Sequence, residues 1–400
     1  MTRPETNNTS AAGTGPLMLD GADAARQSLA TGAAGIALLH LERALIGSGS
    51  WPDAHSRIRE AATGALDGGQ HTGLYYGTPA IAFLLNCAAK ADSRYAASAA
   101  TLDQHVTHLT QRRLTTATAR IKHGVAASLR EYDLFYGLTG IGALLMQRLP
   151  ASDTLADLLR YLTVLVRPYQ HDDFVLPGWW AAHDPDPTLP TPGGHANLGM
   201  AHGAAGILAL LALAMRHGHV VEDHAEAIDQ LTRWFDRWRQ HDAEGSTWWP
   251  QWLTLENLRT GRASQPKPGR PSWCYGTPGI ARALQLAAIA TDDPTRRADA
   301  ENALAACLTD SHVDRLTDLG LCHGLAGLYA TAQQATADAQ SPALKQRLPA
   351  LASAIQTAAH NRDQDGDAGL LTGHAGIHLA AETARHGTTN SGWGTCLLIV

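Results

Sequence analysis

Hydrophobic and polar positions along the chain follow a pattern that recurs seven times. Each recurrence reads x-Gly-x-x-Gly and continues into an apolar run rich in Ala, Leu and Ile. We call each recurrence a glycine unit and number them in chain order; they begin at Thr31, Tyr76, Tyr136, His202, Tyr275, His323 and Thr372. Unit two departs from the pattern, with Ala80 in place of the second glycine. An internal repeat of this kind predicts one supersecondary unit used several times.

Each glycine unit predicts the start of an interior helix. Glycine permits a tight turn and a close approach of backbones, and a run that is apolar on most faces belongs inside the protein. The stretches between units are more amphipathic, as in residues 221–238, which suits an outer layer. Seven alternations of outer and inner helix are expected to close into an all-α fold, a double-layered α/α toroid whose glycine-led ends face one mouth.

Two proline-rich loops are expected beside that mouth. Residues 184–194 and 264–272 cannot continue a helix, and each lies just ahead of a glycine unit. No alternating strand run is evident, although the longer gaps leave room for a small inserted sheet. Residues 1–16 are polar and predict a loose tail, and residues 17–400 are expected to form a single domain.

Composition supports this interpretation and narrows the function. Of 400 residues, 44% are hydrophobic but only 4 are Phe and 9 are Tyr, which favours closely packed helices over aromatic-rich sheets. The net charge of −6 gives no basic footprint for nucleic acid. No apolar run reaches the roughly 18 residues of a membrane-spanning helix, and the N-terminus lacks a signal core. A cytoplasmic protein without a transmembrane segment is expected.

The cysteines indicate a metal site. Five widely spaced cysteines, an odd number, argue against a disulfide framework. Cys322 and His323 are consecutive at the start of unit six, and Cys274 occupies the matching position of unit five. Together they predict a zinc site with three protein ligands and an open fourth position, which is the pattern of catalytic zinc. The remaining cysteines are interpreted as ordinary buried thiols; they are Cys87, Cys307 and Cys396.

Other polar residues fall at the starts of units, where the toroid would bring them together. His202 and Tyr275 directly precede the first glycines of units four and five, and Asp133 lies three residues before Tyr136. Taken singly, a histidine or aspartate at a helix start is more often a cap or a satisfied polar group than a catalyst.

Three segments within the seven units resemble the lanthionine synthetase C (LanC) cyclases. They are Ala201-His-Gly203, Trp273-Cys-Tyr-Gly276 and Leu321-Cys-His-Gly324, and the resemblance extends from about residue 30 to 380. It implies an α/α toroid with one zinc ion per chain, held by Cys274, Cys322 and His323. It also implies that His202 is the acid/base histidine and Asp133 the active-site aspartate, with Tyr275 after the first zinc cysteine and Arg270 four residues before it.

The resemblance also implies an activity: addition of a peptide cysteine thiol to dehydroalanine or dehydrobutyrine, which makes the thioether rings of a lanthipeptide. Zinc would deprotonate the thiol. The enolate formed by its attack needs a proton, for which His202 is the best donor, and a partner for its oxygen, for which Tyr275 and Arg270 are candidates. Asp133 would orient the histidine.

The expected partners are a dehydrated precursor peptide with its leader, a separate dehydratase and an export transporter, in a complex that places the protein peripherally at the membrane. A separate dehydratase is expected because no room for one precedes unit one. Three alternatives remain open: a LanC-like protein that adds glutathione or another thiol, a non-catalytic leader-binding scaffold, and a helical-toroid glycoside hydrolase. The hydrolase needs two opposed carboxylates, and the unit starts offer only Asp133.

Overall fold

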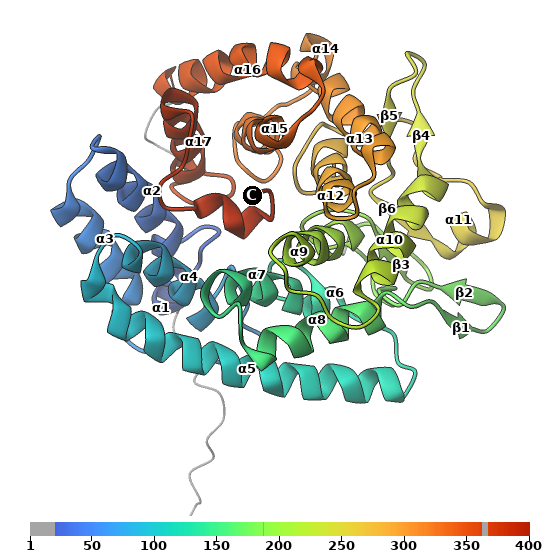
Figure 1. Cartoon of the computed structure of the whole chain (residues 1–400), viewed down its shortest axis with the longest axis horizontal. Coiled ribbons are helices and arrows are strands. Elements are labelled where there is room, and N and C mark those ends of the chain that lie inside the picture. Colours follow the sequence, from blue (N-terminus) through green and yellow to red (C-terminus); the bar gives the residue numbers. More distant parts are fainter. Residues whose placement is uncertain (1–20, 187, 362–366) are drawn as a thin grey trace, which may run out of the picture.

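The computed structural model describes residues 21–186, 188–361 and 367–400, so the tail predicted over residues 1–16 lies outside the described residues. Two concentric layers of helices form a ring, which Figure 1 views end-on. The predicted all-α toroid is therefore confirmed.

A helix of the inner layer begins directly after the first glycine of each glycine unit, which serves as its N-cap residue. The inner helices are α2 (Ala33–Ile46), α4 (Thr78–Ala89), α7 (Leu138–Arg148), α9 (Ala204–Arg216), α12 (Thr277–Ala290), α15 (Leu325–Asp338) and α17 (His374–His386). They are buried on nearly all faces; in α9 every residue from Ala204 to Ala214 is buried. Consecutive inner helices pack against one another, and α17 packs against α2 to close the ring.

The outer helices present one apolar face inward. They are α3 (Trp51–Ala62), α5 (Ala96–Lys122), α8 (Asp153–Leu165), α10 (His224–Trp238), α13 (Pro294–Ala306) and α16 (Pro342–Asn361). The amphipathic stretch at 221–238 folds as α10, whose buried residues Ala227, Leu231 and Trp238 share one face. Shorter helices lie in the connections: α1 (Gly21–Arg26), η1 (Ser93–Tyr95), α6 (Leu129–Tyr132), α11 (Leu255–Thr260), α14 (Asp310–Val313) and η2 (Trp393–Leu397).

The seventh pair differs from the expected pattern. After α17 the chain turns into the centre of the ring, where Figure 1 marks the C-terminus, and no outer helix follows in the described residues. Leu397 and Leu398 are fully buried there. The Trp273 indole N–H donates to the carbonyl of Leu397 over 3.0 Å, and Tyr75 Oη donates to the carbonyl of Cys396 over 2.8 Å. The apolar, glycine-containing end of the sequence thus fills the inside of the ring.

The described residues include six short strands, inserted on one side of the ring. They are β1 (Tyr169–His171), β2 (Phe174–Leu176), β3 (His195–Asn197), β4 (Gln240–His241), β5 (Thr247–Trp248) and β6 (Trp252–Thr254). They form three antiparallel pairs, β1 with β2, β3 with β6 and β4 with β5. Around them, the predicted loops at 184–194 and 264–272 are free of helix in their described residues. Strand β3 leads directly into unit four and so fixes the approach to His202.

Candidate metal centre

A closed circuit of backbone hydrogen bonds holds the starts of the seven glycine units together. Its members are the residues two positions before the first glycine of each unit, with Leu29 and Leu134 as neighbouring donors. The bonds run from Leu29 N to Tyr75 O, Tyr75 N to Phe135 O, Leu134 N to Ala201 O, Ala201 N to Cys274 O, Cys274 N to Cys322 O, Cys322 N to Leu371 O and Leu371 N to Ala30 O, over 2.8 to 3.2 Å. Because Cys274 and Cys322 occupy this position in consecutive units, the circuit makes them direct neighbours.

In units five and six, the second glycine of the unit allows this circuit to form. A Cβ on Gly279 would lie 2.0 Å from the carbonyl oxygen of Trp273, and one on Gly327 would lie 2.0 Å from that of Leu321. Real Cβ atoms do not approach so closely, so each helix must carry glycine where the preceding loop folds back onto it. The two glycines thus set the positions of the residues beside Cys274 and Cys322.

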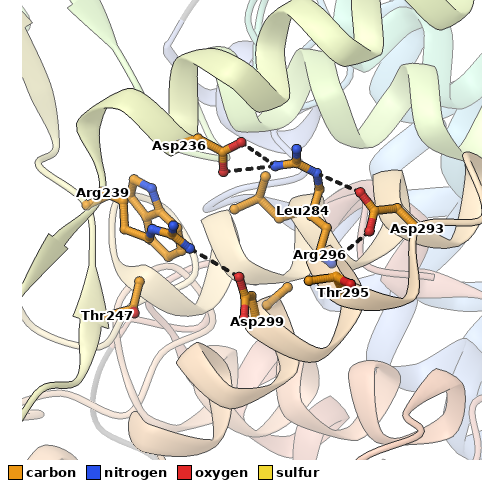
Figure 2. Close-up of a pocket in the computed structure, with 10 residues that line it drawn as sticks. Asp236, Arg239, Thr247, Leu284, Asp293, Thr295, Arg296 and Asp299 are labelled. Atoms are coloured by element: carbon orange, nitrogen blue, oxygen red, sulfur yellow. Dashed lines mark hydrogen bonds and ion pairs between the residues drawn. The ribbon is translucent and has the colours of Figure 1, made fainter.

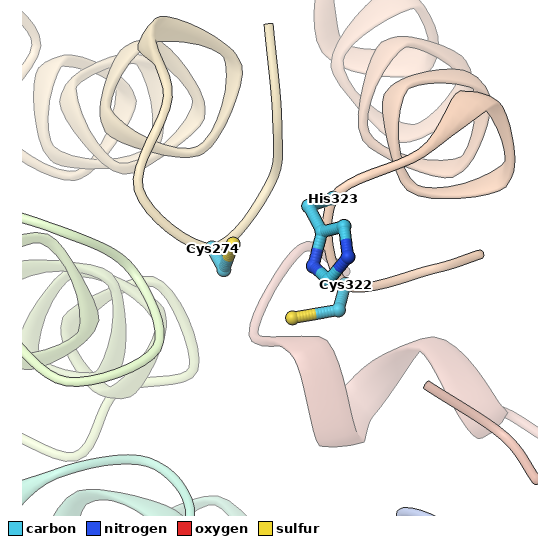
Figure 3. Close-up of side chains that lie close together, drawn as sticks. All are labelled: Cys274, Cys322 and His323. Carbon is cyan, nitrogen blue, oxygen red and sulfur yellow. The ribbon is translucent and has the colours of Figure 1, made fainter. Parts of the chain in front are cut away.

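Cys274, Cys322 and His323 come together at this point, as Figure 3 shows. Their two sulfurs and a ring nitrogen all lie within 4.8 Å of one another. In the described part of the chain, no other three His, Cys, Asp or Glu side chains bring ligand atoms that close. Cys274 is buried, and the other two are half-buried. Two thiols and an imidazole are a donor set that suits zinc, so the residues present fit the predicted metal.

Hydrogen bonds within this group shift the pKa values of all three side chains. Hydrogen bonding with Cys322, and further hydrogen bonding with His323 and Ser272, holds the pKa of the Cys274 thiol well below its usual range despite burial. The same contact with Cys274, with burial, raises the pKa of Cys322. The hydrogen bond to Cys274 also raises the pKa of His323. A divalent cation would replace the protons of these hydrogen bonds, because its ligands must be thiolates and a neutral imidazole.

A carboxylate that the sequence analysis missed holds the histidine. Asp318 Oδ2 lies 2.6 Å from His323 Nε2. With Nε2 taken, Nδ1 is the nitrogen left to face a metal. The signal was present in the sequence, because Asp318-Leu-Gly-Leu321 before unit six matches Asp367-Ala-Gly-Leu370 before unit seven.

His202 and Asp133 form a second pair beside the candidate metal ligands. Asp133 is 2% exposed and its Oδ2 lies 2.7 Å from His202 Nδ1. Its other oxygen, Oδ1, accepts the backbone N–H groups of Tyr136 and Gly137, each over 2.7 Å. These hydrogen bonds fix the Asp133 carboxylate, which in turn fixes the imidazole of His202. Nε2 of His202 is left for another partner. The His202 ring lies 4.8 Å from that of Phe135.

Tyr275 and Arg270 lie around the same group. The rings of Tyr275 and His202 are 5.9 Å apart. Burial raises the pKa of Tyr275, and the side chain of Asn197 works against that rise. The hydroxyl is therefore protonated at neutral pH and can donate a hydrogen bond. Arg270 is exposed, and its positive charge works against the rise that the contact with Cys274 causes in the pKa values of Cys322 and His323. Asn197, fully buried on β3, is a further residue that the sequence analysis missed.

Cys87, Cys307 and Cys396 are buried, as the sequence predicted, and none of them belongs to this group of ligand atoms. Burial raises the pKa of each thiol to about 12. These three thiols are inert at neutral pH.

A separate pocket of about 240 Å³ lies in the outer layer, between α10, α13 and β5. Figure 2 shows that its charged side chains are already paired. Arg296 lies 2.8 Å from Asp236, and Arg239 lies 3.2 Å from Asp299. These pairs tie α10 and its following turn to α13, and we assign the pocket a structural role.

Comparisons with known proteins agree with the geometry. A family model described as lanthionine synthetase C-like protein matches residues 23–398. The solved structure of a protein called nisin cyclase superposes with a TM-score of 0.79 at 19% identity, covering 94% of this chain and 92% of that chain. This likeness supports the toroidal fold.

A curated protein, the nisin biosynthesis protein NisC of Lactococcus lactis subsp. lactis, is 27% identical over 143 residues. The aligned segment is 34% of this chain and 32% of that protein, so the match spans about a third of the curated relative.

Proposed function

The chain belongs to the lanthionine synthetase C-like family, and from this premise we propose that it is a zinc-dependent lanthipeptide cyclase. The reaction would add a cysteine thiol of a dehydrated precursor peptide to dehydroalanine or dehydrobutyrine in the same peptide, forming lanthionine or methyllanthionine. The observation that carries the proposal is the meeting of Cys274, Cys322 and His323 within 4.8 Å, next to the His202–Asp133 pair.

Cys274, Cys322 and His323 would hold one zinc ion per chain and leave one tetrahedral position for the substrate. A zinc ion held there lowers the pKa of a substrate thiol, so that the thiol is available as a nucleophile at neutral pH. The C–S bond forms at the β carbon as the C=C π bond breaks, and the thiol proton is released. One proton is then returned to the α carbon, so the mass of the peptide is unchanged.

His202 would supply that proton from Nε2. Asp133, whose Oδ2 lies 2.7 Å from Nδ1, would hold the imidazole in the orientation for that transfer. Tyr275, whose phenol is protonated at neutral pH, would donate a hydrogen bond to the enolate oxygen. Arg270, which acts electrostatically on Cys322 and His323, would stabilise the same negative charge.

The proposed substrate requires a separate dehydratase to make the dehydro-amino acids, and the ring-containing product would pass to an export transporter. All five cysteines are free thiols, which fits a reducing compartment such as the cytoplasm. None of the described helices combines the length and the apolar character needed to cross a membrane.

The first experiment is the zinc content of the purified protein, measured for wild type, Cys274→Ala and Cys322→Ala. We expect about one zinc per chain in wild type and a clear loss in both variants. Cys307→Ala, which removes a buried thiol outside the group, is the matched control and should keep its zinc. Folded wild type that binds no zinc after supplementation would refute the metal-dependent mechanism.

The second experiment is cyclisation of a dehydrated precursor peptide. Because ring formation leaves the mass unchanged, the readout is loss of free peptide thiols, counted by alkylation. Wild type should consume one peptide thiol for each dehydrated residue that reacts, and Cys274→Ala should consume none.

A further inference from the structure

Three aspartates occupy the same place in three different glycine units. Asp67, Asp318 and Asp367 lie in the loops before α4, α15 and α17. In each, Oδ1 accepts the N–H of the residue two positions later, a glycine, over 2.7 to 2.9 Å. In each, the backbone carbonyl accepts the N–H of the first residue of the helix that follows, over 2.7 to 3.2 Å.

The second carboxylate oxygen of each aspartate serves a different purpose. It contacts the side chain directly before the first glycine of its own unit. Asp67 Oδ2 accepts the hydroxyl of Tyr76, and Asp367 Oδ2 accepts the hydroxyl of Thr372. In unit six the residue at that position is His323, and Asp318 Oδ2 lies 2.6 Å from its Nε2. The repeat therefore provides a fixed acceptor, and unit six uses it to hold an imidazole.

We propose that Asp318 is a positioning residue for the metal centre: by accepting the Nε2–H of His323 it fixes the tautomer whose Nδ1 lone pair faces Cys274 and Cys322. This inference rests on the proposed zinc site. A carboxylate behind a ligating histidine orients the ring and raises the basicity of the ligating nitrogen, and its loss costs typically 10- to 100-fold in metal affinity.

Asp318→Asn is the sharpest substitution. The amide oxygen of Asn can still accept the N–H of Gly320, which preserves the loop, but its NH₂ group cannot accept the Nε2–H. An amide donor facing Nε2 favours the tautomer that carries its proton on Nδ1, where the metal would bind. Asp318→Ala removes the contact with His323 and also the acceptor of the Gly320 N–H. It therefore shows how much zinc affinity depends on the shape of the loop as well.

Asp367→Asn is the matched control. It makes the same chemical change in the same turn of unit seven, where the side chain held is Thr372 and not a candidate ligand. Any loss of zinc affinity caused merely by weakening such a turn would appear in this variant too.

The experiment measures zinc affinity by competition with a chromophoric chelator, together with thermal unfolding of the metal-free proteins. Asp318→Asn should bind zinc about 10- to 100-fold more weakly than wild type, with a metal-free unfolding temperature close to that of Asp367→Asn. Asp367→Asn should keep wild-type affinity.

Wild-type zinc affinity in Asp318→Asn would overturn the inference and leave the proposed function standing. The same holds if only Asp318→Ala weakens binding, because the contribution of Asp318 would then be to loop shape. Wild type without zinc would overturn both the metal site and the role of Asp318.

Discussion

Each histidine of the candidate site is held by an aspartate. The two pairs differ in whether the aspartate precedes the same glycine unit as its histidine or a different one. Asp318, in the loop before unit six, reaches His323 of that unit, whereas Asp133, in the loop before unit three, reaches across to His202 of unit four. A fixed imidazole with one nitrogen left over can act as a ligand or as a proton donor, depending on what faces that nitrogen. The two pairs therefore support two roles, metal binding for His323 and proton transfer for His202.

His202→Ala should lower the cyclisation rate about 10²- to 10⁴-fold, the usual contribution of a positioned general acid. Zinc content should stay at the wild-type level, because His202 is not among the candidate ligands. The measurement is the time course of peptide thiol loss by alkylation.

His71→Ala is the control for this variant. His71 is also paired with an aspartate, Asp67, over 2.8 Å, but its side chain is 50% exposed and it lies outside the group around Cys274. It should cyclise at close to the wild-type rate. A His202→Ala variant as fast as His71→Ala would remove His202 from the proposed scheme.

At the scale of single residues, sequence position was enough to predict that Cys274, Cys322 and His323 meet, because the repeat places matching positions side by side. Asp318 and Asn197 were missed. Their importance depends on which side chain each one faces, and that is set by the paths of the loops before α15 and α9. The periodicity of the helices carries no information about those paths.

Among the secondary-structure elements, strand β3 matters most for the site. It pairs with β6 and leads through Leu198 and Gly199 into unit four. His195 on this strand is fully buried, its Nδ1 donates to the carbonyl of His183 over 2.8 Å, and its Nε2 has no hydrogen-bond partner among the described residues. Burial, opposed by that hydrogen bond, lowers the pKa of His195 to about 4.

This depressed pKa predicts a loss of stability in mild acid. The unfolded chain, with a histidine pKa of about 6.5, binds a proton more readily than the folded protein does. Stability from His195 is therefore complete above pH 6.5 and is lost as the pH falls toward 4. Linkage gives a loss of about 2 kcal/mol between pH 7 and pH 5.

His195→Gln tests this prediction. The amide N–H can still donate to His183, but the side chain no longer titrates. The free energy of unfolding is measured with urea at pH 7 and at pH 5. The decrease between the two pH values should be about 2 kcal/mol smaller in the variant than in wild type. His219→Gln, on the turn after α9, is the control and should leave the difference unchanged. Equal pH dependence in wild type and His195→Gln would show that His195 does not titrate in this range.

The helices were predictable from the sequence and the strands were not. The inner helices are long apolar runs marked by glycines, and α10 has a clear amphipathic period. The strands are two or three residues long, too short to display alternation, and β3 is buried at all three positions. These strands form because segments of the connections between helices lie side by side in the folded protein, which is a tertiary effect.

Over the whole molecule, closure of the ring depends on contacts between the two ends of the fold. Helix α17 packs against α2, and Arg43 lies 3.1 Å from Glu382 across that seam. The repeat predicted that a ring would close. It could not predict that the chain would turn inward after α17, because the last residues belong to no glycine unit. Their burial follows from the apolar character of residues 396–400, which the centre of the ring shields from water.

The seam has two buried acidic residues, Glu42 and Glu382, and substitution of Glu42 tests whether the ring unfolds as a unit. Glu42 on α2 is 1% exposed and accepts the backbone N–H groups of Asn390 and Ser391, each over 2.8 Å. Glu42→Ala removes the acceptor of both N–H groups, of which that of Ser391 is buried, and should lower the free energy of unfolding by about 3 kcal/mol. Glu60→Ala, which removes only an exposed ion pair with Arg57, should cost less than about 1 kcal/mol.

The measurement is urea unfolding followed by circular dichroism, which reports the helices, and by tryptophan fluorescence, to which the buried Trp393 beside the seam contributes. Every inner helix packs against two neighbours. Opening the seam therefore exposes the facing sides of α2 and α17, and unfolding should spread from helix to helix around the ring. The two signals of Glu42→Ala should therefore shift together to lower urea. A fluorescence change that precedes the loss of helix would mean instead that the inward-turned end detaches while the ring stays closed, and that contacts between the inner helices hold the toroid without it.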